Sequence, residues 1–130
     1  MNRTSIKPKK SKTKSVSQGI VHIYATFNNT IITITDTSGN ALCSCSSGQA
    51  GFKGARKSTP YAAQMAADRV AKQAISSFSM QNVEVHLNGP GPGRDSAIRA
   101  CALAGLKVRK IVEKTGVPFN GCRPPKERRV

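Results

Sequence analysis

The feature that most constrains the fold is a series of short segments, between residues 19 and 46, in which apolar and polar residues alternate. Residues 20–27 read IVHIYATF, and this alternation predicts a strand. One face of that strand is apolar: Val21, Ile23, Ala25 and Phe27. Residues 28–29 (Asn-Asn) predict a two-residue turn, because Asn tolerates a positive φ. The β-branched segment 30–36, a turn at 37–40 and a third strand at 41–46 then complete an antiparallel meander.

From residue 47 the pattern changes to helices separated by single strands. Thr59 is a good N-cap and Pro60 a good first helical residue, so we expect a helix that reaches about residue 78. Its alanine-rich stripe should lie close against the sheet. That stripe consists of Ala63, Ala67, Val70, Ala74, Ile75 and Phe78. Met65 and Tyr61 are expected to pack in the core or at its edge.

A second helical segment lies between two more strands, at residues 83–87 and 106–112. Asp95 or Ser96 is expected to cap this helix, and Gly105 to end it with a left-handed residue. Strands that alternate with helices require right-handed crossovers and parallel pairing. The predicted fold class is therefore α/β: a mixed five-stranded sheet with two main helices, in one domain.

The charge of the chain indicates a polyanionic partner. Its 21 Lys and Arg residues oppose 6 Asp and Glu residues, which gives a net charge of +15. Such self-repulsion is tolerated when nucleic acid neutralises it. An anionic membrane surface is the alternative, but the sequence contains no basic amphipathic helix with Trp or Phe opposite the charge. It also contains no apolar run of about 20 residues and no signal-peptide pattern, so we expect no membrane association.

The two ends of the chain carry much of this charge. We divide the sequence into a basic disordered N-terminal arm (residues 1–18), an α/β body (19–115) and an extended basic C-terminal tail (116–130). The arm contains Lys and Arg but no acid before residue 18, and a transit peptide is its competing interpretation. In the tail, Pro124 and Pro125 keep the chain extended beside four cations, as suits a folded RNA surface.

Two glycine-rich loops also contain cations and each precedes a helix, at residues 48–57 and 89–94. Glycine allows a backbone to approach phosphate, and a helix start offers free N–H groups. Both loops follow strands, at the edge of an α/β sheet where ligands bind. Phosphate contact is the functional interpretation, and ordinary glycine turns with solvated charges are the alternative. Neither loop matches the P-loop or the dinucleotide pattern.

Catalysis and metal binding have little support in the sequence. A two-metal nuclease needs several converging carboxylates. Asp36, Glu84 and Asp95 are the acids that could approach one another, although isolated caps and surface acids are the simpler interpretation. His22 and His86 fall on polar strand faces, as packed or rim histidines would. The four cysteines, Cys43, Cys45, Cys101 and Cys122, form no C-x-x-C pair and predict reduced, mostly buried thiols rather than a zinc site or any other cofactor site.

Two further features bear on how RNA would be bound. Aromatic residues are few, which favours contacts to the backbone and shape of a folded RNA over base stacking. In the tail, Asn120 precedes Gly121, so the glycine nitrogen can attack the Asn side chain and convert it to isoaspartate through a succinimide. A simple Asn-Gly turn is the alternative.

Four stretches carry a family likeness: FNNTIITITD (27–36), SSGQAGFKGARKSTPYAAQMAA (46–67), NGPGPGRDSAIRA (88–100) and NGCRPP (120–125). They resemble the bacterial-type (or plastid-type) ribosomal protein S-eleven of the small subunit. The resemblance covers almost everything from Gly19 onward, whereas the N-terminal arm matches only in being basic.

The resemblance implies a ribonuclease-H-like fold without that enzyme's active site. It also implies a non-enzymatic protein on the platform of the small subunit, beside ribosomal proteins S-seven and S-eighteen and near the cleft where upstream messenger RNA pairs with ribosomal RNA. The family is known for isoaspartate at the Asn of the tail sequence NGC, so the resemblance implies this modification at Asn120. We expect no homo-oligomer, and a ribosome in the plastid stroma, slightly preferred, or in the bacterial cytoplasm.

The residues expected to bind ribosomal RNA are cations and amides of the arm, the loops, the second helix and the tail. They are Lys9, Lys10, Lys12, Lys14, Asn28, Asn29, Lys53, Arg56, Lys57, Arg94, Arg99, Asn120, Arg123, Lys126, Arg128 and Arg129.

Overall fold

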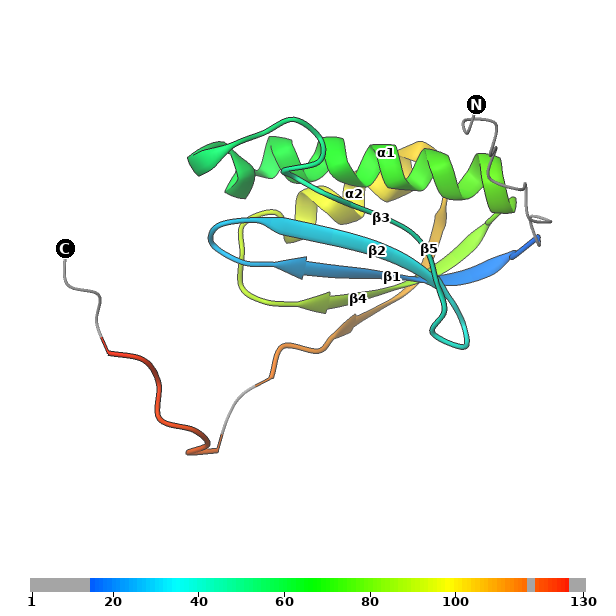
Figure 1. The fold of residues 1–130 in the computed structure, drawn as a ribbon. Helices are drawn as coiled ribbons and strands as arrows, with labels where there is room; N and C mark the ends of the chain where they lie inside the picture. The colour runs from blue at the N-terminus through cyan, green and yellow to red at the C-terminus, as the bar shows by residue number, and fades with distance from the viewer. Residues whose placement is uncertain (1–14, 117–118, 127–130) are drawn as a thin grey trace, which may run out of the picture.

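The computed structural model describes residues 15–116 and 119–126, apart from the side chain of Ala55. Strands and helices follow one another in the predicted order (Figure 1). The elements are β1 (Gln18–Ala25), β2 (Thr30–Asp36), β3 (Ala41–Ser46), the 3-10 helix η2 (Gly54–Ser58), α1 (Pro60–Phe78), β4 (Asn82–Asn88), α2 (Arg94–Ala104) and β5 (Lys107–Glu113).

The five strands form one mixed sheet in the order β3-β2-β1-β4-β5. β2 is antiparallel to both β1 and β3, whereas β4 is parallel to both β1 and β5. The meander therefore makes one half of the sheet, and the strands that follow the helices make the other half. This arrangement confirms the predicted α/β class and the mixed five-stranded sheet.

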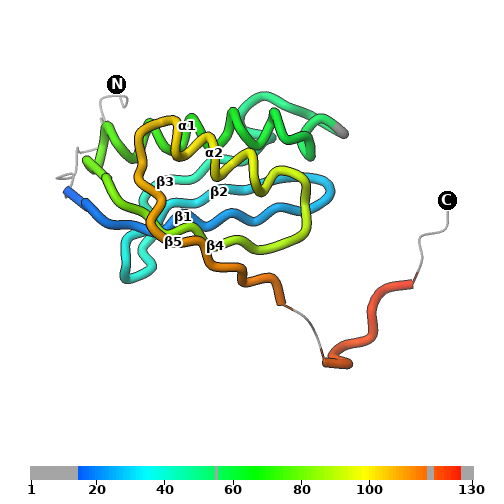
Figure 2. Tube along the Cα trace, turned by 180° about the vertical axis from the view of Figure 1, so that it is seen from behind, coloured from blue at the N-terminus to red at the C-terminus, as the bar shows by residue number. Residues whose placement is uncertain are grey.

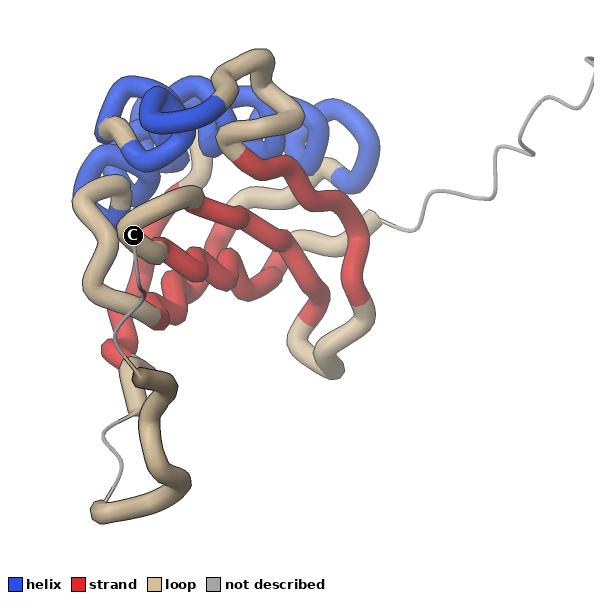
Figure 3. Tube along the Cα trace, turned by 60° about the vertical axis from the view of Figure 1, so that its left-hand side comes forward, coloured by secondary structure: helices blue, strands red, loops and turns tan. Residues whose placement is uncertain are grey.

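Both helices cover the same face of the sheet, and no helix of the described part of the chain lies on the other face (Figure 3). The buried face of α1 is almost entirely alanine: Ala62, Ala63, Ala66, Ala67, Ala71 and Ala74, with Val70. Because alanine carries only a methyl group, α1 lies close to the strands, as the sequence predicted. The largest fully buried side chains include three isoleucines of β1 and β2: Ile23, Ile32 and Ile34.

The connection between β1 and β2 differs from the prediction. β1 ends at Ala25, which pairs with Thr30, so the connection has four residues rather than two. The Thr26 hydroxyl accepts hydrogen bonds from the backbone N–H groups of Asn28 and Asn29. A threonine turn thus replaces the expected positive-φ Asn turn. Phe27, predicted to face the core, lies in this turn and is 71% exposed.

The start of α2 also differs from the prediction. The helix begins at Arg94 with Gly93 as its N-cap, and no side chain caps it. Asp95 lies in its first turn, and Ala97 donates its backbone N–H to the Gly93 carbonyl. The predicted caps at Asp95 and Ser96 are therefore wrong. The predicted positive φ at Gly105 is confirmed, at 120°.

The first turns of α1 expose two residues that were expected to pack in the core or at its edge. Met65 is 41% exposed and Tyr61 is 59% exposed. The Tyr61 ring lies edge-to-face against Phe52, with 5.7 Å between the ring centroids. The expected N-cap is confirmed, because the Thr59 hydroxyl accepts a hydrogen bond from Ala62 N–H at 3.2 Å.

Three cysteines are buried free thiols, in agreement with the sequence prediction, and Cys122 is exposed. Cys43 and Cys45 lie on the same face of β3 and line the core. Burial raises the pKa of Cys43 to about 11 and, with a smaller contribution from Asp68, that of Cys101 to about 12. These thiols stay protonated near neutral pH and act as small core side chains.

The first described residues of the chain already contact the body. Val16 packs against the core and donates its N–H to the Phe78 carbonyl, while Ser17 accepts from Gln81 and Asn82. Residues 1–14, which hold most of the predicted basic arm, lie outside the described residues. Among the described helices, none is long and apolar enough to cross a membrane.

Candidate nucleic-acid interface

The connections that precede both helices start at one edge of the sheet, which we call the carboxyl edge. β1, β3, β4 and β5 all end there and β2 begins there, because β3 is antiparallel to β2 and β2 to β1. α1 and α2 also begin at this edge (Figure 1). In the view from behind, the C-terminal segment leaves the body on the same side (Figure 2). The sheet topology therefore brings together the loops that the sequence singled out.

The β1–β2 turn is one part of this edge. Asn29 uses its side-chain oxygen within the turn, where it accepts the N–H of Thr30 at 2.9 Å. Asn28 is exposed, and its side chain makes no hydrogen bond within the described residues. Of the two predicted RNA-binding amides in this turn, Asn28 thus presents its side chain to the outside, whereas Asn29 stabilises the turn.

The first glycine loop, residues 48–57, is anchored at its base and open on its outer side. Ser47 N–H donates to the Thr30 carbonyl, and Arg69 holds the loop through the Gln49 carbonyl at 3.0 Å. Gly51 and Gly54 have φ values of 106° and 61°, and a Cβ added at either would meet nothing within 4 Å. The backbone here has a conformation that suits glycine, and open space lies around it.

The three predicted RNA-binding cations of this loop lie on or beside η2. Lys53 and Arg56 are exposed, and Lys57 is half-buried. Among the described residues, no ion pair or side-chain hydrogen bond involves any of the three. They form an unneutralised cationic cluster beside the start of α1, which we call the η2 cluster.

The second glycine loop is built in the opposite way. A Cβ on Gly91 would lie 2.4 Å from the Thr26 carbonyl oxygen, and a Cβ on Gly93 would lie 2.6 Å from both the Ala63 Cβ and the Thr30 Oγ1. Gly91 N–H donates to the Ala25 carbonyl at 2.9 Å. Gly91 thus allows close contact with the backbone of the β1–β2 turn, and Gly93 allows close contact with the side chains of Ala63 and Thr30, so both glycines serve packing within the protein.

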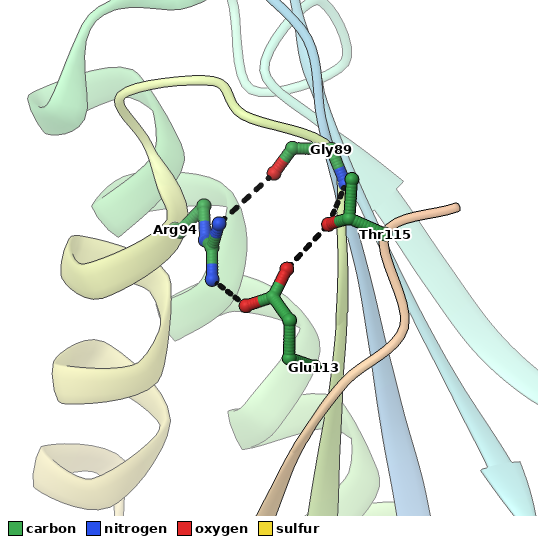
Figure 4. A network of polar contacts seen from close by, with 4 residues as sticks. All are labelled: Gly89, Arg94, Glu113 and Thr115. Atoms are coloured by element: carbon green, nitrogen blue, oxygen red, sulfur yellow. Dashed lines mark hydrogen bonds and ion pairs between the residues drawn. The ribbon is translucent and has the colours of Figure 1, made fainter. Parts of the chain in front are cut away.

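Arg94, which follows this loop, is part of a closed ring of hydrogen bonds (Figure 4). Its guanidinium donates to the Gly89 carbonyl at 3.3 Å and forms an ion pair with Glu113. The Thr115 hydroxyl donates to the other Glu113 oxygen and accepts from Gly89 N–H at 3.1 Å. Arg94 is therefore partly neutralised within the protein, unlike the cations of the η2 cluster.

The remaining predicted residues lie on α2, in the tail or outside the described residues. Arg99 is exposed on α2, five residues after its start. In the tail, Asn120, Arg123 and Lys126 are exposed, and Asn120 has a left-handed φ of 56°. The other predicted cations lie outside the described residues: Lys9, Lys10, Lys12, Lys14, Arg128 and Arg129.

Exposed aromatic rings at this edge were missed by the sequence analysis. Phe27 lies at the tip of the β1–β2 turn, and Tyr61 lies in the first turn of α1 beside Phe52. Phe27 had been assigned to the core because the apolar alternation of the strand continues through it, and Tyr61 had been assigned to packing in the core or at its edge. Phe27 follows the end of a strand and Tyr61 follows a helix N-cap. These positions were the signals that both side chains would be exposed.

The carboxylates proposed for a nuclease do not converge. Asp36 lies at the carboxyl end of β2, at the opposite edge of the sheet from Asp95. It caps its own turn by accepting from Ser38 and Asn40, and these hydrogen bonds, the backbone bond of Asn40 foremost, lower its pKa. Glu84 contacts His86 instead. Within the described residues, no group of three metal-ligating side chains forms.

The two histidines, far apart in sequence, lie side by side on the uncovered face of the sheet. His22 and His86 are partners in the β1–β4 register, with ring centroids 5.3 Å apart. The pKa of His22 is lowered, mainly by burial and to a smaller extent by the charges of His86 and Lys114. The His22 ring also contacts the Thr35 hydroxyl at 3.1 Å. They are thus the partly buried strand histidines that the sequence predicted.

A family model and individual relatives all match this chain to one family of proteins. The model of the family described as ribosomal protein S11 matches residues 19–129. The chain is 57% identical to small ribosomal subunit protein uS11 of Chromobacterium violaceum over 127 residues, which cover 98% of this chain and 96% of that protein. It is 54% identical over 130 residues, the full length of both chains, to the proteins of the same name from Psychromonas ingrahamii and Aromatoleum aromaticum. These relatives are bacterial, so they do not support the preference for a plastid.

Proposed function

Because the chain belongs to the ribosomal protein S11 family, we propose that it is a structural, non-enzymatic component of the small ribosomal subunit that binds small-subunit ribosomal RNA through the carboxyl edge of its sheet. The observation that carries this proposal is the η2 cluster. Three cations without partners among the described residues lie beside an open glycine backbone and the start of a helix. Phosphate groups suit such a surface, because they accept hydrogen bonds from both side chains and free backbone N–H groups.

The topology supports a large polyanion rather than a small anion as the ligand. The η2 cluster, the β1–β2 turn and the end of β5 belong to one edge. Exposed Phe27 and Tyr61 lie beside these polar groups and can stack on unpaired bases. An edge that combines phosphate-binding cations with a few rings fits folded RNA with single-stranded loops.

Our proposal for the cellular setting follows the family. The protein occupies the platform of the small subunit in the bacterial cytoplasm, beside ribosomal proteins S-seven and S-eighteen and near upstream messenger RNA. The basic arm, the tail and Arg99 on α2 add RNA contacts through the predicted cations. The chain acts without a cofactor and without forming a homo-oligomer, and Asn120 is a site of isoaspartate formation.

The test compares two triple variants that change the net charge equally. Lys53→Gln, Arg56→Gln and Lys57→Gln neutralise the η2 cluster. The control variant carries Lys107→Gln, Arg109→Gln and Lys110→Gln. These three cations lie in the first half of β5, which starts at the opposite edge of the sheet. Affinity for a small-subunit ribosomal RNA transcript is measured between 50 and 200 mM salt.

For the unmodified chain we expect a loss of about 10³–10⁵ in affinity over this range, as for roughly 6–10 phosphate contacts. Each phosphate contact contributes about 0.7–0.9 to the steepness of the plot of log affinity against log salt. Because the variant of the η2 cluster loses three cations, its plot should be shallower by about 2–3. The plot of the control variant on β5 should be shallower by less than about 1. A flat salt response of the unmodified chain, or equal effects of the two variants, contradicts the proposal.

A further inference from the structure

The hydrogen-bonded ring of Figure 4 joins three segments at the carboxyl edge. Gly89 belongs to the loop after β4, Arg94 starts α2, and Glu113 and Thr115 lie at and just beyond the end of β5. Lys114 N–H donates to the Leu87 carbonyl at 2.7 Å and extends the β4–β5 pairing past the last strand residue. The chain is therefore held through Thr115, shortly before the exposed tail residues begin.

Every hydrogen bond of the ring joins two groups of the protein itself. The Glu113 carboxylate receives the Thr115 hydroxyl on one oxygen and the Arg94 guanidinium on the other. These contacts, the Thr115 hydrogen bond foremost, lower the pKa of Glu113, so the carboxylate is ionised at neutral pH. Gly89 closes the ring through its backbone, and its φ of 98° explains why a glycine lies there.

We propose that Arg94, Glu113 and Thr115 form a latch that sets the direction in which the C-terminal tail leaves the body, and that this latch strengthens RNA binding by the tail. The inference rests on the RNA binding proposed above. In this role the three are positioning residues. Without the latch, the segment after β5 samples more conformations, and RNA binding must then order it at a cost in affinity.

A latch and a direct phosphate contact by Arg94 predict opposite effects of Glu113→Gln. This substitution keeps the side-chain size, removes one negative charge and leaves the Thr115 hydroxyl without its carboxylate acceptor. If Arg94 bound phosphate directly, its release and the added charge would strengthen RNA binding. If the ring is a latch, RNA binding weakens although the net charge becomes more positive.

The experiment measures affinity of the full-length chain for the small-subunit ribosomal RNA transcript at fixed salt. Thr115→Val removes the hydroxyl without a change in charge. We expect about tenfold weaker binding, because RNA binding must then fix the backbone of about one more residue. Thr115→Ser keeps the hydroxyl and should bind like the unmodified chain. Thr37→Val, in the exposed turn at the opposite edge, is the matched control and should have no effect.

A double-mutant cycle shows whether the effect passes through the tail. In a chain that also carries Arg123→Gln and Lys126→Gln, Thr115→Val should weaken binding less than about twofold. If Thr115→Val abolishes the thermal unfolding transition, Glu113→Gln replaces it in the cycle. Tighter binding by Glu113→Gln, or a Thr115→Val effect that stays the same in the tail variant, overturns the latch. An unmodified chain that does not bind the transcript overturns the proposed function instead.

Discussion

Replacing Gly93 by alanine tests how the carboxyl edge is assembled. Gly93 lies where the start of α2 meets α1 and β2, and its backbone has φ −82° and ψ −2°, which alanine adopts without strain. An added Cβ would lie 2.6 Å from the Cβ of Ala63 and 2.6 Å from the Oγ1 of Thr30. Neither neighbour can move away easily, because one is fixed on a helix and the other is fully buried in a strand.

The expected loss of stability is about 3 kcal/mol. Overpacking a core by one methyl group typically costs about 1–3 kcal/mol, and two contacts with rigid atoms place this site at the upper end. The smaller terms nearly cancel: alanine is a poorer N-cap than glycine, but it also lowers the entropy of the unfolded chain, by about 0.4–1 kcal/mol in free energy. Urea unfolding followed by circular dichroism measures the difference.

Gly48→Ala is the matched control, because its added Cβ would meet no atom closer than 3.6 Å. We expect a change within about 0.5 kcal/mol there. Combining Gly93→Ala with Thr30→Ala removes one of the two contacts, and the Thr30 hydroxyl has no hydrogen-bond partner among the described residues. That pair should recover at least about 1 kcal/mol relative to the sum of the single changes. Equal stability of the Gly93→Ala and Gly48→Ala variants would refute the close-packing argument.

Two further predictions concern α1 and the histidine pair. Thr59→Ala removes the N-cap hydrogen bond to Ala62 and should cost about 1 kcal/mol in the free energy of unfolding, measured by thermal melts against Thr59→Ser. His22 has a pKa below its ordinary value when folded, so the unfolded chain binds a proton first as the pH falls. Stability should therefore decline below about pH 6.5 and less so in a His22→Gln variant, while equal pH profiles of the two proteins would contradict this assignment.

The regular elements could be predicted because their signals are local. Alternation in β1 and β2, the Thr59-Pro60 start of α1 and its alanine stripe each fall within one segment, and each agrees with the structure. The strand directions followed from the connections between elements. The η2 cluster was likewise predictable as a place on the chain, because glycines and cations between a strand and a helix point to the carboxyl edge.

The errors arose where tertiary contacts decide a local structure. Gly93 starts α2 because it packs against Ala63 and Thr30, which no capping signal in the sequence records. Thr26 builds the β1–β2 turn with its hydroxyl, and Phe27 is thereby exposed. The two glycine loops look alike in composition. They differ in their surroundings, because Gly51 and Gly54 face open space whereas Gly91 and Gly93 are closely packed.

That difference between the glycine loops bears on the kind of ligand the edge can accept. In an open α/β sheet, ligands bind where neighbouring strands send their connections in opposite directions. Here β1 leads to β2 on one side, whereas β4 leads through α2 to β5 on the other. The second glycine loop packs against the end of β1 at this place, where Gly91 N–H donates to the Ala25 carbonyl. The exposed cations of the η2 cluster lie on the outer surface of this edge. Such a surface suits an extended polyanion better than a small enclosed ligand.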